Sequence, residues 1–255
     1  MIIKTLQWNI GGGLIRDKHS NKLSDISYDV DGLKYIINVL KEINPDIVTL
    51  QETHESKTTS QTKDISRGLG MSFYALDSYD NSHLNEKAKL SQSIISRYPL
   101  SNHKYQKFIN PGYKVLINGK EYPCHDKGVT STYADIDGDN LHLETLHLLP
   151  FGRTSIDPLG KEAREYRDDI SSKISTDSKR LLLQGDFNFD NESLKPFIPN
   201  IFSKGTKEIL QTTPTRATGK HYDHVVYRGL KFIKSTVLID TLTDHFPIVA
   251  EFELS

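Results

Sequence analysis

The chain has 255 residues, 36% hydrophobic and 25% charged, so a packed globule is expected rather than a disordered chain. This length fits one domain spanning residues 1–255, since a single hydrophobic core stops growing near ~250–300 residues. The net charge of -1 argues against a generic basic nucleic-acid binder, and one cysteine, Cys124, excludes an intramolecular disulfide and a Cys/His zinc cluster.

The N-terminal segment predicts a strand, a loop, a helix and a second strand. Residues 2–9 read as a strand that ends at Asn9 and is broken by the glycines at 11–13, and the polar stretch 16–29 predicts a surface loop. Five apolar residues then fall on one helical face before Asn44-Pro45 ends the helix: Leu33, Ile36, Ile37, Leu40 and Ile43. The apolar run 47–50 predicts a buried strand.

The rest of the chain is rich in strand-like runs. They lie near 72–76, 92–96, 129–136, 141–147, 181–183, 225–227 and 248–252. Asn118-Gly119 predicts a hairpin turn between 115–117 and 121–122. Asp157-Pro158 predicts a helix start, and the apolar face of that helix is Ala163, Tyr166, Ile170 and Ile174. Many strands with few long helices predict two packed sheets with helices outside.

Polar side chains that can bind metal or handle protons recur at the ends of the predicted strands. They are Asn9, Glu52, His147, Asp186 with Asn188, Asp223 with His224, and Asp244 with His245. One carboxylate at a strand end is usually a cap or turn residue. Six such positions in one chain indicate a common site, because strand ends from one sheet converge in space.

These residue types favour metal-assisted attack on phosphorus. Glu52 and Asp244 supply hard oxygen ligands of the kind that Mg²⁺ or Mn²⁺ prefers. Asp186 can activate a water, and a histidine paired with a carboxylate can stabilise charge on a phosphoryl group. The sequence has no Gly-x-Ser-x-Gly elbow, and its triple glycine lacks the Gly-Lys-Ser/Thr of a Walker loop.

Seven segments, in order along nearly the whole chain, resemble the endonuclease/exonuclease/phosphatase superfamily, which contains pancreatic deoxyribonuclease. They are Gln7–Ile10, Val48–Thr53, Ser96–Leu100, Leu146–Leu148, Gly185–Asn188, Tyr222–Val226 and Thr243–Ile248. The resemblance implies an α/β (α+β) fold: a four-layer αββα sandwich with two packed, mostly antiparallel sheets. It also implies that Glu52 is the principal Mg²⁺ ligand, with Asp244 near the metal.

The resemblance assigns further roles. Asn9 would hold Glu52 or the attacking water, Asp186 would align or deprotonate that water, and Asn188 would fix it. His245 would contact the scissile phosphate, oriented by Asp223, and His147 would touch another phosphate oxygen. The chain departs from the family at Thr243, where serine is usual, and from abasic-site endonucleases at His54 and His147, where they carry lysine and tyrosine.

Hydrolysis of a nucleic-acid phosphodiester, with DNA as the first choice, is the leading hypothesis. From Lys57 to Lys127 there are 11 basic against 6 acidic residues, a basic flank that suits a polyanion, although a solvated surface gives the same pattern. Candidate backbone contacts are Arg67, Arg97, Arg153 and Lys127, and candidate stacking residues are Tyr113 and Phe151.

Two alternatives stay open: a phosphodiesterase or phosphatase acting on a lipid or other small phosphoester, and a catalytically inactive binding module. The inactive module is disfavoured because none of the active-site groups is lost. The sequence shows neither a leader pattern nor an apolar stretch of ~20 residues, so a cytoplasmic protein is expected, and a monomer is favoured.

Overall fold

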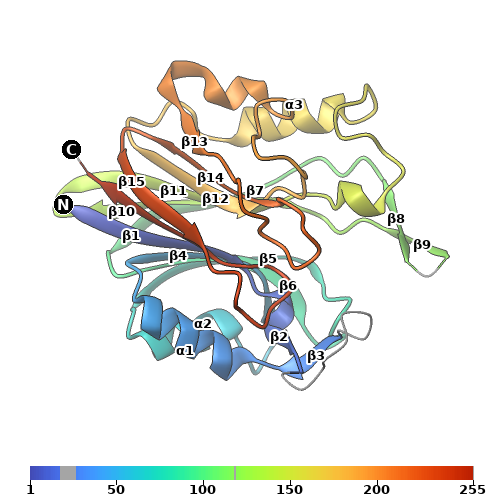
Figure 1. Cartoon of the computed structure of the whole chain (residues 1–255), viewed down its shortest axis with the longest axis horizontal. Coiled ribbons are helices and arrows are strands. Elements are labelled where there is room, and N and C mark those ends of the chain that lie inside the picture. The colour runs from blue at the N-terminus through green and yellow to red at the C-terminus, as the bar shows by residue number, and fades with distance from the viewer. Residues whose placement is uncertain (18–26, 118, 255) are drawn as a thin grey trace.

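The computed structural model describes residues 1–17, 27–117 and 119–254, and it contains two six-stranded sheets lying face to face (Figure 1). The first sheet runs in the order β15 (Lys231–Val237), β16 (Ile248–Glu253), β1 (Ile2–Asn9), β4 (Ile47–Glu55), β6 (Lys89–Ser96) and β5 (Phe73–Asn81). The second sheet runs in the order β13 (Lys207–Ile209), β14 (Asp223–Arg228), β12 (Leu181–Asp186), β11 (Asp139–His147), β10 (Gly128–Ile136) and β7 (Leu100–Lys107).

Each sheet is mostly antiparallel around one parallel central pair. In the first sheet β1 runs parallel to β4, and in the second β11 runs parallel to β12. The other neighbours in both sheets pair antiparallel. The predicted sandwich of two mostly antiparallel sheets is confirmed.

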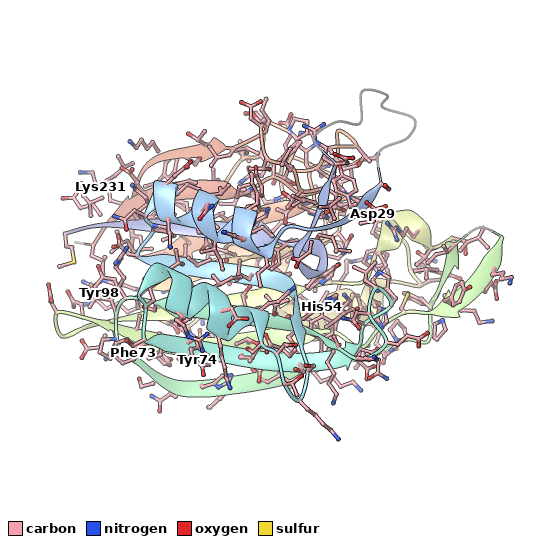
Figure 2. The ribbon with its side chains drawn as sticks, turned by 90° about the horizontal axis from the view of Figure 1, so that it is seen from below. Asp29, His54, Phe73, Tyr74, Tyr98 and Lys231 are labelled. Atoms are coloured by element: carbon pink, nitrogen blue, oxygen red, sulfur yellow. The ribbon has the colours of Figure 1, made fainter. Side chains whose placement is uncertain are left out.

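Helices cover the outer faces of the sandwich. Figure 2 shows α1 (Leu33–Ile43) and α2 (Gln61–Leu69) across the first sheet, and Figure 1 shows α3 (Arg164–Lys173) beyond the second, on the side where the 3-10 helix η4 (Pro199–Gly205) packs. The small elements are η1 (Gly11–Gly13), β2 (Leu14–Arg16), β3 (Tyr28–Asp31), η3 (Phe151–Arg153) and the hairpin of β8 (Lys114–Ile117) with β9 (Lys120–Pro123). Among the described residues, no helix is both long and apolar enough to cross a membrane.

The space between the sheets changes from apolar to polar along its length. At one end Ile3 and Ile94 of the first sheet share a buried cluster with Leu143 of the second. Elsewhere the sheets are joined by buried side-chain hydrogen bonds, such as Gln51 Nε2 to Thr145 Oγ1 at 2.8 Å. Burying amides between sheets is favourable only when they are paired, so these bonds fix the register of one sheet against the other.

Three sequence predictions need correction or fall partly outside the described residues, and one helix was not predicted. The ends of the predicted loop 16–29 are strands, since β2 pairs with β3, and residues 18–26 lie outside the described residues. The segment 57–70, for which the sequence patterns predicted no helix, contains α2, which Ser60 caps by accepting from Lys63 N. The hairpin at 115–122 exists, although Asn118 lies outside the described part.

The helix predicted to start at Asp157-Pro158 begins only at Arg164. Asp157 does form a capping turn, accepting from Leu159 N at 2.9 Å, but the turn stops at Gly160. The Arg167 guanidinium donates to the carbonyl oxygens of Pro158 and Gly160, which therefore bond to a side chain rather than to the next helical turn. The predicted apolar face is correct, and its four residues are buried: Ala163, Tyr166, Ile170 and Ile174.

A buried acid in β11 makes the stability of the fold depend on pH. Glu144 accepts from Ser175 N at 3.0 Å, while its other carboxylate oxygen has no partner among the described residues. Burial raises the pKa of Glu144 from 4.5 to about 7. The stability that this group contributes is therefore complete below pH 4.5 and is lost, by about 3 kcal/mol, as the pH rises through 7.

We expect Glu144→Gln to gain stability relative to the wild type between pH 5 and pH 8, because its amide does not ionise. Urea unfolding at both pH values measures the difference. Glu86→Gln, at an exposed position, is the control and should show no such change with pH. A difference between Glu144→Gln and wild type that is the same at pH 5 and pH 8 would contradict the prediction.

Candidate active site

Strand polarity explains why the predicted residues meet at one edge of the sandwich. Asn9 ends β1, and Glu52 lies near the end of the parallel neighbour β4. In the second sheet His147 ends β11 and lies opposite Asp186 at the end of the parallel strand β12. Asp223, which begins the antiparallel strand β14, lies opposite Asp186 on its other side. Carboxyl ends of parallel strands meet at one edge, as expected.

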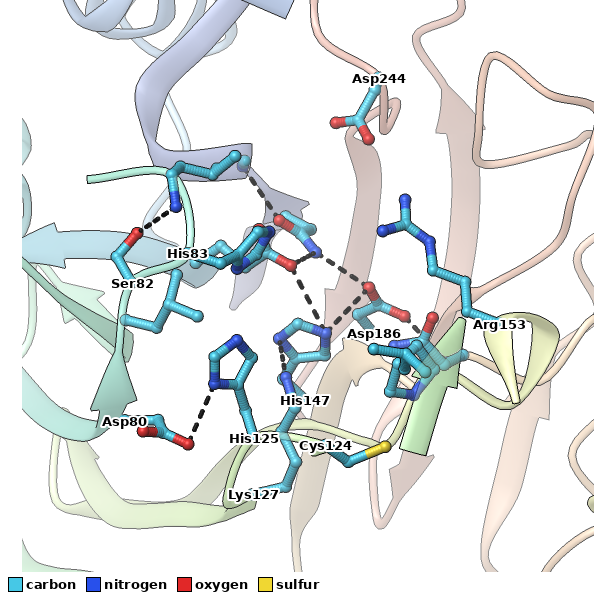
Figure 3. Close-up of a pocket in the computed structure, with 18 of the residues that line it drawn as sticks. Asp80, Ser82, His83, Cys124, His125, Lys127, His147, Arg153, Asp186 and Asp244 are labelled. Carbon is cyan, nitrogen blue, oxygen red and sulfur yellow. Dashed lines mark hydrogen bonds and ion pairs between the residues drawn. The ribbon is translucent and has the colours of Figure 1, made fainter. Parts of the chain in front are cut away.

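Asp186 is the centre of the group (Figure 3). Its Oδ2 accepts a hydrogen bond from Asn9 Nδ2 at 2.9 Å and lies 3.5 Å from His147 Nε2 and 3.8 Å from His245 Nε2. Its Oδ1 accepts from the backbone N–H of Asn188 at 2.9 Å. One buried carboxylate therefore lies beside residues from three other parts of the chain, at Asn9, His147 and His245.

Burial raises the pKa of Asp186 to about 6, and the nearby charge of Asp223 acts in the same direction while His245 opposes it. A carboxylate with this pKa is ionised at neutral pH and is more basic than an ordinary aspartate. It is therefore suited to accept a proton from an attacking water.

Asp223 and Gln7 hold His245 from behind. His245 Nδ1 lies 2.8 Å from Asp223 Oδ2, and the other oxygen of Asp223 accepts from Gln7 Nε2 at 2.7 Å. Burial alone would lower the pKa of His245, but Asp223, with Asp244 and Asp186, raises it to about 10. The imidazole is thus a fixed cation with Nε2 directed toward Asp186, able to stabilise negative charge on a phosphoryl oxygen.

Glu52 lies at a β-bulge in β4. The pairing of β4 with β6 shifts between Gln51 and Thr53, and Glu52 itself adopts φ 54°, a left-handed value that costs a non-glycine residue energy. The nearest partners of its carboxylate are Asn9 Nδ2 at 3.4 Å and His147 Nε2 at 3.7 Å. Among the described residues, the carboxylate that the bulge presents makes no short hydrogen bond, which suits a cation ligand.

The turn carrying Asp244 and His245 is tied to the first sheet. Trp8 Nε1 lies 3.0 Å from the carbonyl of His245 and 3.2 Å from Thr243 Oγ1, so threonine makes the anchoring contact at this position. Asp244 Oδ2 accepts from Arg216 Nη2 at 3.1 Å. Burial would raise the pKa of Asp244, but the positive charges of His245 and Arg216 hold it below its ordinary value.

The donor set fits a hard divalent cation. Asp186, Asp223 and His245 offer ligand atoms within 4.8 Å of one another, but both oxygens of Asp223 are already engaged by Gln7 and His245. Glu52 and Asp244 line the same cavity, so each offers a further carboxylate to an ion bound there. A cation bound there would polarise a phosphoryl oxygen and neutralise developing charge.

A cavity of about 780 Å³ opens over these groups. Of the predicted site residues, it is lined by Asn9, Glu52, His147, Arg153, Asp186, Asn188, Asp244 and His245. Asp223 lies behind His245 and is fully buried. One wall is more apolar and includes Val115, Ile117 and Tyr122 of the β8–β9 hairpin. The structure thus gathers the predicted polar set around one cavity.

Two of the three predicted substrate arginines lie away from this cavity. Arg67 pairs with Asp64 on the surface of α2. Arg97 bonds to the carbonyl of Pro45, before β4 begins, and its neighbour Tyr98 is seen in Figure 2 at the end of the molecule away from the β8–β9 hairpin. A long side chain near a strand end pairs with whichever carbonyl or carboxylate the fold brings close to it. The sequence does not show whether that strand end lies at the cavity or at the opposite edge of the sheet.

The candidate stacking residues also lie elsewhere. Phe151 belongs to the core, and Tyr113 packs against that core while its hydroxyl donates to the carbonyl of Glu162 at 2.6 Å. Sequence reasoning missed Arg216 and Tyr79, which sit in a turn and an edge strand without a distinctive pattern. It also missed the role of Gln7, although a polar residue two before Asn9 on a buried strand faces the same side.

Comparison with protein families matches residues 6–245 to the Endonuclease/Exonuclease/phosphatase family. A UPF0294 protein of Yersinia pseudotuberculosis is 27% identical over 128 residues, which are 49% of this chain and 47% of that protein. The chain thus aligns with about half the length of that curated relative.

Solved structures share the fold. An endonuclease/exonuclease/phosphatase from Beutenbergia cavernae has a TM-score of 0.75 at 15% identity, covering 100% of this chain and 72% of that one. The mannosyl-6-phosphatase Bt3783 of Bacteroides thetaiotaomicron has a TM-score of 0.60 at 18% identity, covering 98% and 99%. The family match over most of the chain, together with this fold, shows that the protein belongs to the endonuclease/exonuclease/phosphatase family.

Proposed function

We propose that this protein is a Mg²⁺- or Mn²⁺-dependent phosphodiester hydrolase that acts on nucleic acid, with DNA as its substrate. The observation that carries the proposal is the buried carboxylate of Asp186, held between Asn9 and two histidines and facing a cavity that Glu52 also lines. Uncatalysed phosphodiester hydrolysis is very slow, so an enzyme must lower the barrier by roughly 20 kcal/mol. Several groups acting together can supply this.

Each side chain has a role in this reaction. Asp186 accepts a proton from the attacking water, and Asn9 keeps its carboxylate in place. Asn188 donates to the carbonyl of Leu148 at 3.0 Å, which fixes its amide and leaves its oxygen available to the water. His245, charged and held by Asp223, stabilises the phosphoryl oxygens as their charge grows.

The shape of the cavity supports a diester with a bulky organic group. Arg153 and Arg216 line it, together with the aromatic side chains of Tyr28 and Tyr122. Such a wall can take a base or sugar while the cations face phosphate. The basic stretch 57–127 gives little support to nucleic-acid binding at this cavity, because two of its arginines, Arg67 and Arg97, lie away from it.

A phosphatase acting on a small phosphoester is the second candidate. The apolar wall and the fold shared with a mannosyl-6-phosphatase favour it, although that likeness concerns the fold alone. A substrate panel separates the two: supercoiled plasmid, single-stranded DNA, bis(p-nitrophenyl) phosphate, p-nitrophenyl phosphate, mannose 6-phosphate and a phosphoinositide. Cleavage of diesters supports the proposal, whereas phosphate release from monoesters alone, with DNA intact, would replace it with the second candidate.

Metal dependence is tested with Glu52→Gln and a chelator. Chelation should abolish turnover, and added Mg²⁺ or Mn²⁺ should restore it. Glu52→Gln should lower kcat by about 10²-fold or more and require a higher Mg²⁺ concentration for half-maximal rate, because an amide oxygen carries no net charge. Glu86→Gln is the matched control on the surface. Full activity in excess chelator would exclude the metal role.

A further inference from the structure

Lys127 is a buried lysine beside the cavity that the proposed reaction does not use. It precedes β10, lines the cavity and is 5% exposed. Within the part of the chain that the structure describes, no carboxylate forms an ion pair with it. Its Nζ instead lies 3.0 Å from His147 Nδ1 and 4.9 Å from the centre of the Tyr79 ring. Burying an ammonium without a counterion is costly, so the contact with His147 needs an explanation.

Tyr79 makes a second contact with the same nitrogen. It is the bulged residue of β5, where the pairing with β6 shifts between Ser78 and Asp80. Its hydroxyl lies 3.1 Å from His147 Nδ1, and its ring meets the imidazole edge-on. Burial raises the pKa of Tyr79 well above its ordinary value, so the hydroxyl keeps its proton and can donate it. A residue of the first sheet thus reaches the histidine of the second.

The two partners determine which nitrogen of His147 carries the proton. An ammonium group has donors and no acceptor, so Nδ1 must supply the lone pair. The ring proton then sits on Nε2, which faces Asp186 Oδ2 at 3.5 Å and Glu52 Oε1 at 3.7 Å. His245 differs at Nδ1, because a carboxylate of Asp223 faces that nitrogen and requires a proton there.

We propose that Lys127, assisted by Tyr79, is a positioning residue that holds His147 as the Nε2–H tautomer, so that His147 donates a hydrogen bond into the cavity. Only the identity of the acceptor, a phosphate oxygen of the substrate, rests on the proposed function. In this arrangement His147 has no lone pair facing the cavity and cannot take a proton from water. Asp186 is left as the acceptor, and the two histidines near it, His147 and His245, are held by partners of opposite charge.

The tautomer can be measured directly. Protein labelled with ¹⁵N-histidine and loaded with Mg²⁺ is recorded in a long-range ¹H–¹⁵N correlation spectrum, with His147 assigned from a His147→Gln variant. We expect the Nε2–H pattern in the wild type, and a mixture of tautomers in the Lys127→Met/Tyr79→Phe double variant. An Nδ1–H or doubly protonated His147 in the wild type would overturn the proposal, and this reading does not require the Lys127→Met/Tyr79→Phe double variant to fold.

Kinetics with bis(p-nitrophenyl) phosphate supply the second readout. Lys127→Met should lower kcat by about 10- to 100-fold with a smaller change in KM, as for other partners that orient an active-site histidine. Lys127→Arg should recover most of the rate, because a guanidinium also has only donors. Lys173→Met, at a lysine paired with Asp169 on α3, is the matched control and should keep the wild-type rate.

The outcomes separate the two proposals. No recovery in a folded Lys127→Arg variant, or a Lys127→Met rate equal to that of Lys173→Met, would overturn the positioning role. A wild type that hydrolyses no phosphodiester would remove the proposed function, while the spectrum would still decide the tautomer of His147.

Discussion

Asp186→Asn should lower kcat on a phosphodiester by about 10³-fold or more, with the protein still folded. The carboxylate lies beside Asn9, His147 and His245 together, and an amide cannot take a proton from water. The amide also places a donor where three donors point, so the geometry of the group is disturbed as well. Steady-state kinetics with metal at saturation, together with circular dichroism, measure both effects.

The wild-type rate should also fall as the pH drops through the pKa of Asp186. In the metal-free protein that pKa is about 6, raised chiefly by burial, and the charge of a bound cation would move it lower. The acid limb of kcat/KM is therefore expected at or below pH 6 and should be absent from the residual activity of Asp186→Asn. Asp190→Asn, which removes an exposed partner of Lys220, is the control. If Asp186→Asn kept more than a tenth of the wild-type kcat, Asp186 would be excluded as the base that accepts the proton of the attacking water.

Asp223→Asn should reduce both activity and stability. Asp223 accepts from Gln7 Nε2 and from His245 Nδ1, and an asparagine can accept at only one of its two side-chain atoms. Gln7 cannot turn over to help, because its carbonyl oxygen already accepts from Thr49 Oγ1 at 3.3 Å. We expect kcat to fall by about 10²- to 10⁴-fold, and the free energy of unfolding to fall by about 2 kcal/mol.

A compensating variant makes this prediction specific. In Gln7→Glu/Asp223→Asn the new carboxylate accepts from the asparagine amide, whose oxygen can again accept from His245 Nδ1. Urea unfolding should show most of the lost stability restored, with part of the activity. A double variant no more stable than Asp223→Asn alone would show that the Gln7–Asp223 contact does not govern this site.

Local sequence was enough to predict which strand ends carry the active groups. Asn9, His147 and Asp186 each end a run of buried residues, and strand polarity brings such ends together once two sheets are packed. The same patterns predicted both sheets, because alternation and apolar runs report burial directly. Strands with no buried face were missed: β7 and β15 lie at sheet edges and are largely exposed.

The contacts of long side chains could not be predicted from sequence, because their partners come from distant segments. Arg97 and Lys127 were candidates of equal standing, yet one bonds to a carbonyl beside Asn44 and the other to the histidine at the active group. Neither choice is encoded within a few residues of the lysine or arginine. It depends on which bulge, turn or sheet end the packing brings within the reach of a flexible side chain.

The sequence by itself determined which side chains supply the candidate site: carboxylates, asparagines and two histidines at or near strand ends. Only the tertiary structure decided how those groups are held. Glu52 and Tyr79 are aimed by bulges in β4 and β5. The different partners behind His147 and His245 come from both sheets, so Nδ1 accepts a hydrogen bond in His147 and donates one in His245. The physical reason is that a side chain's proton and charge are set by its neighbours in space, which local sequence does not specify.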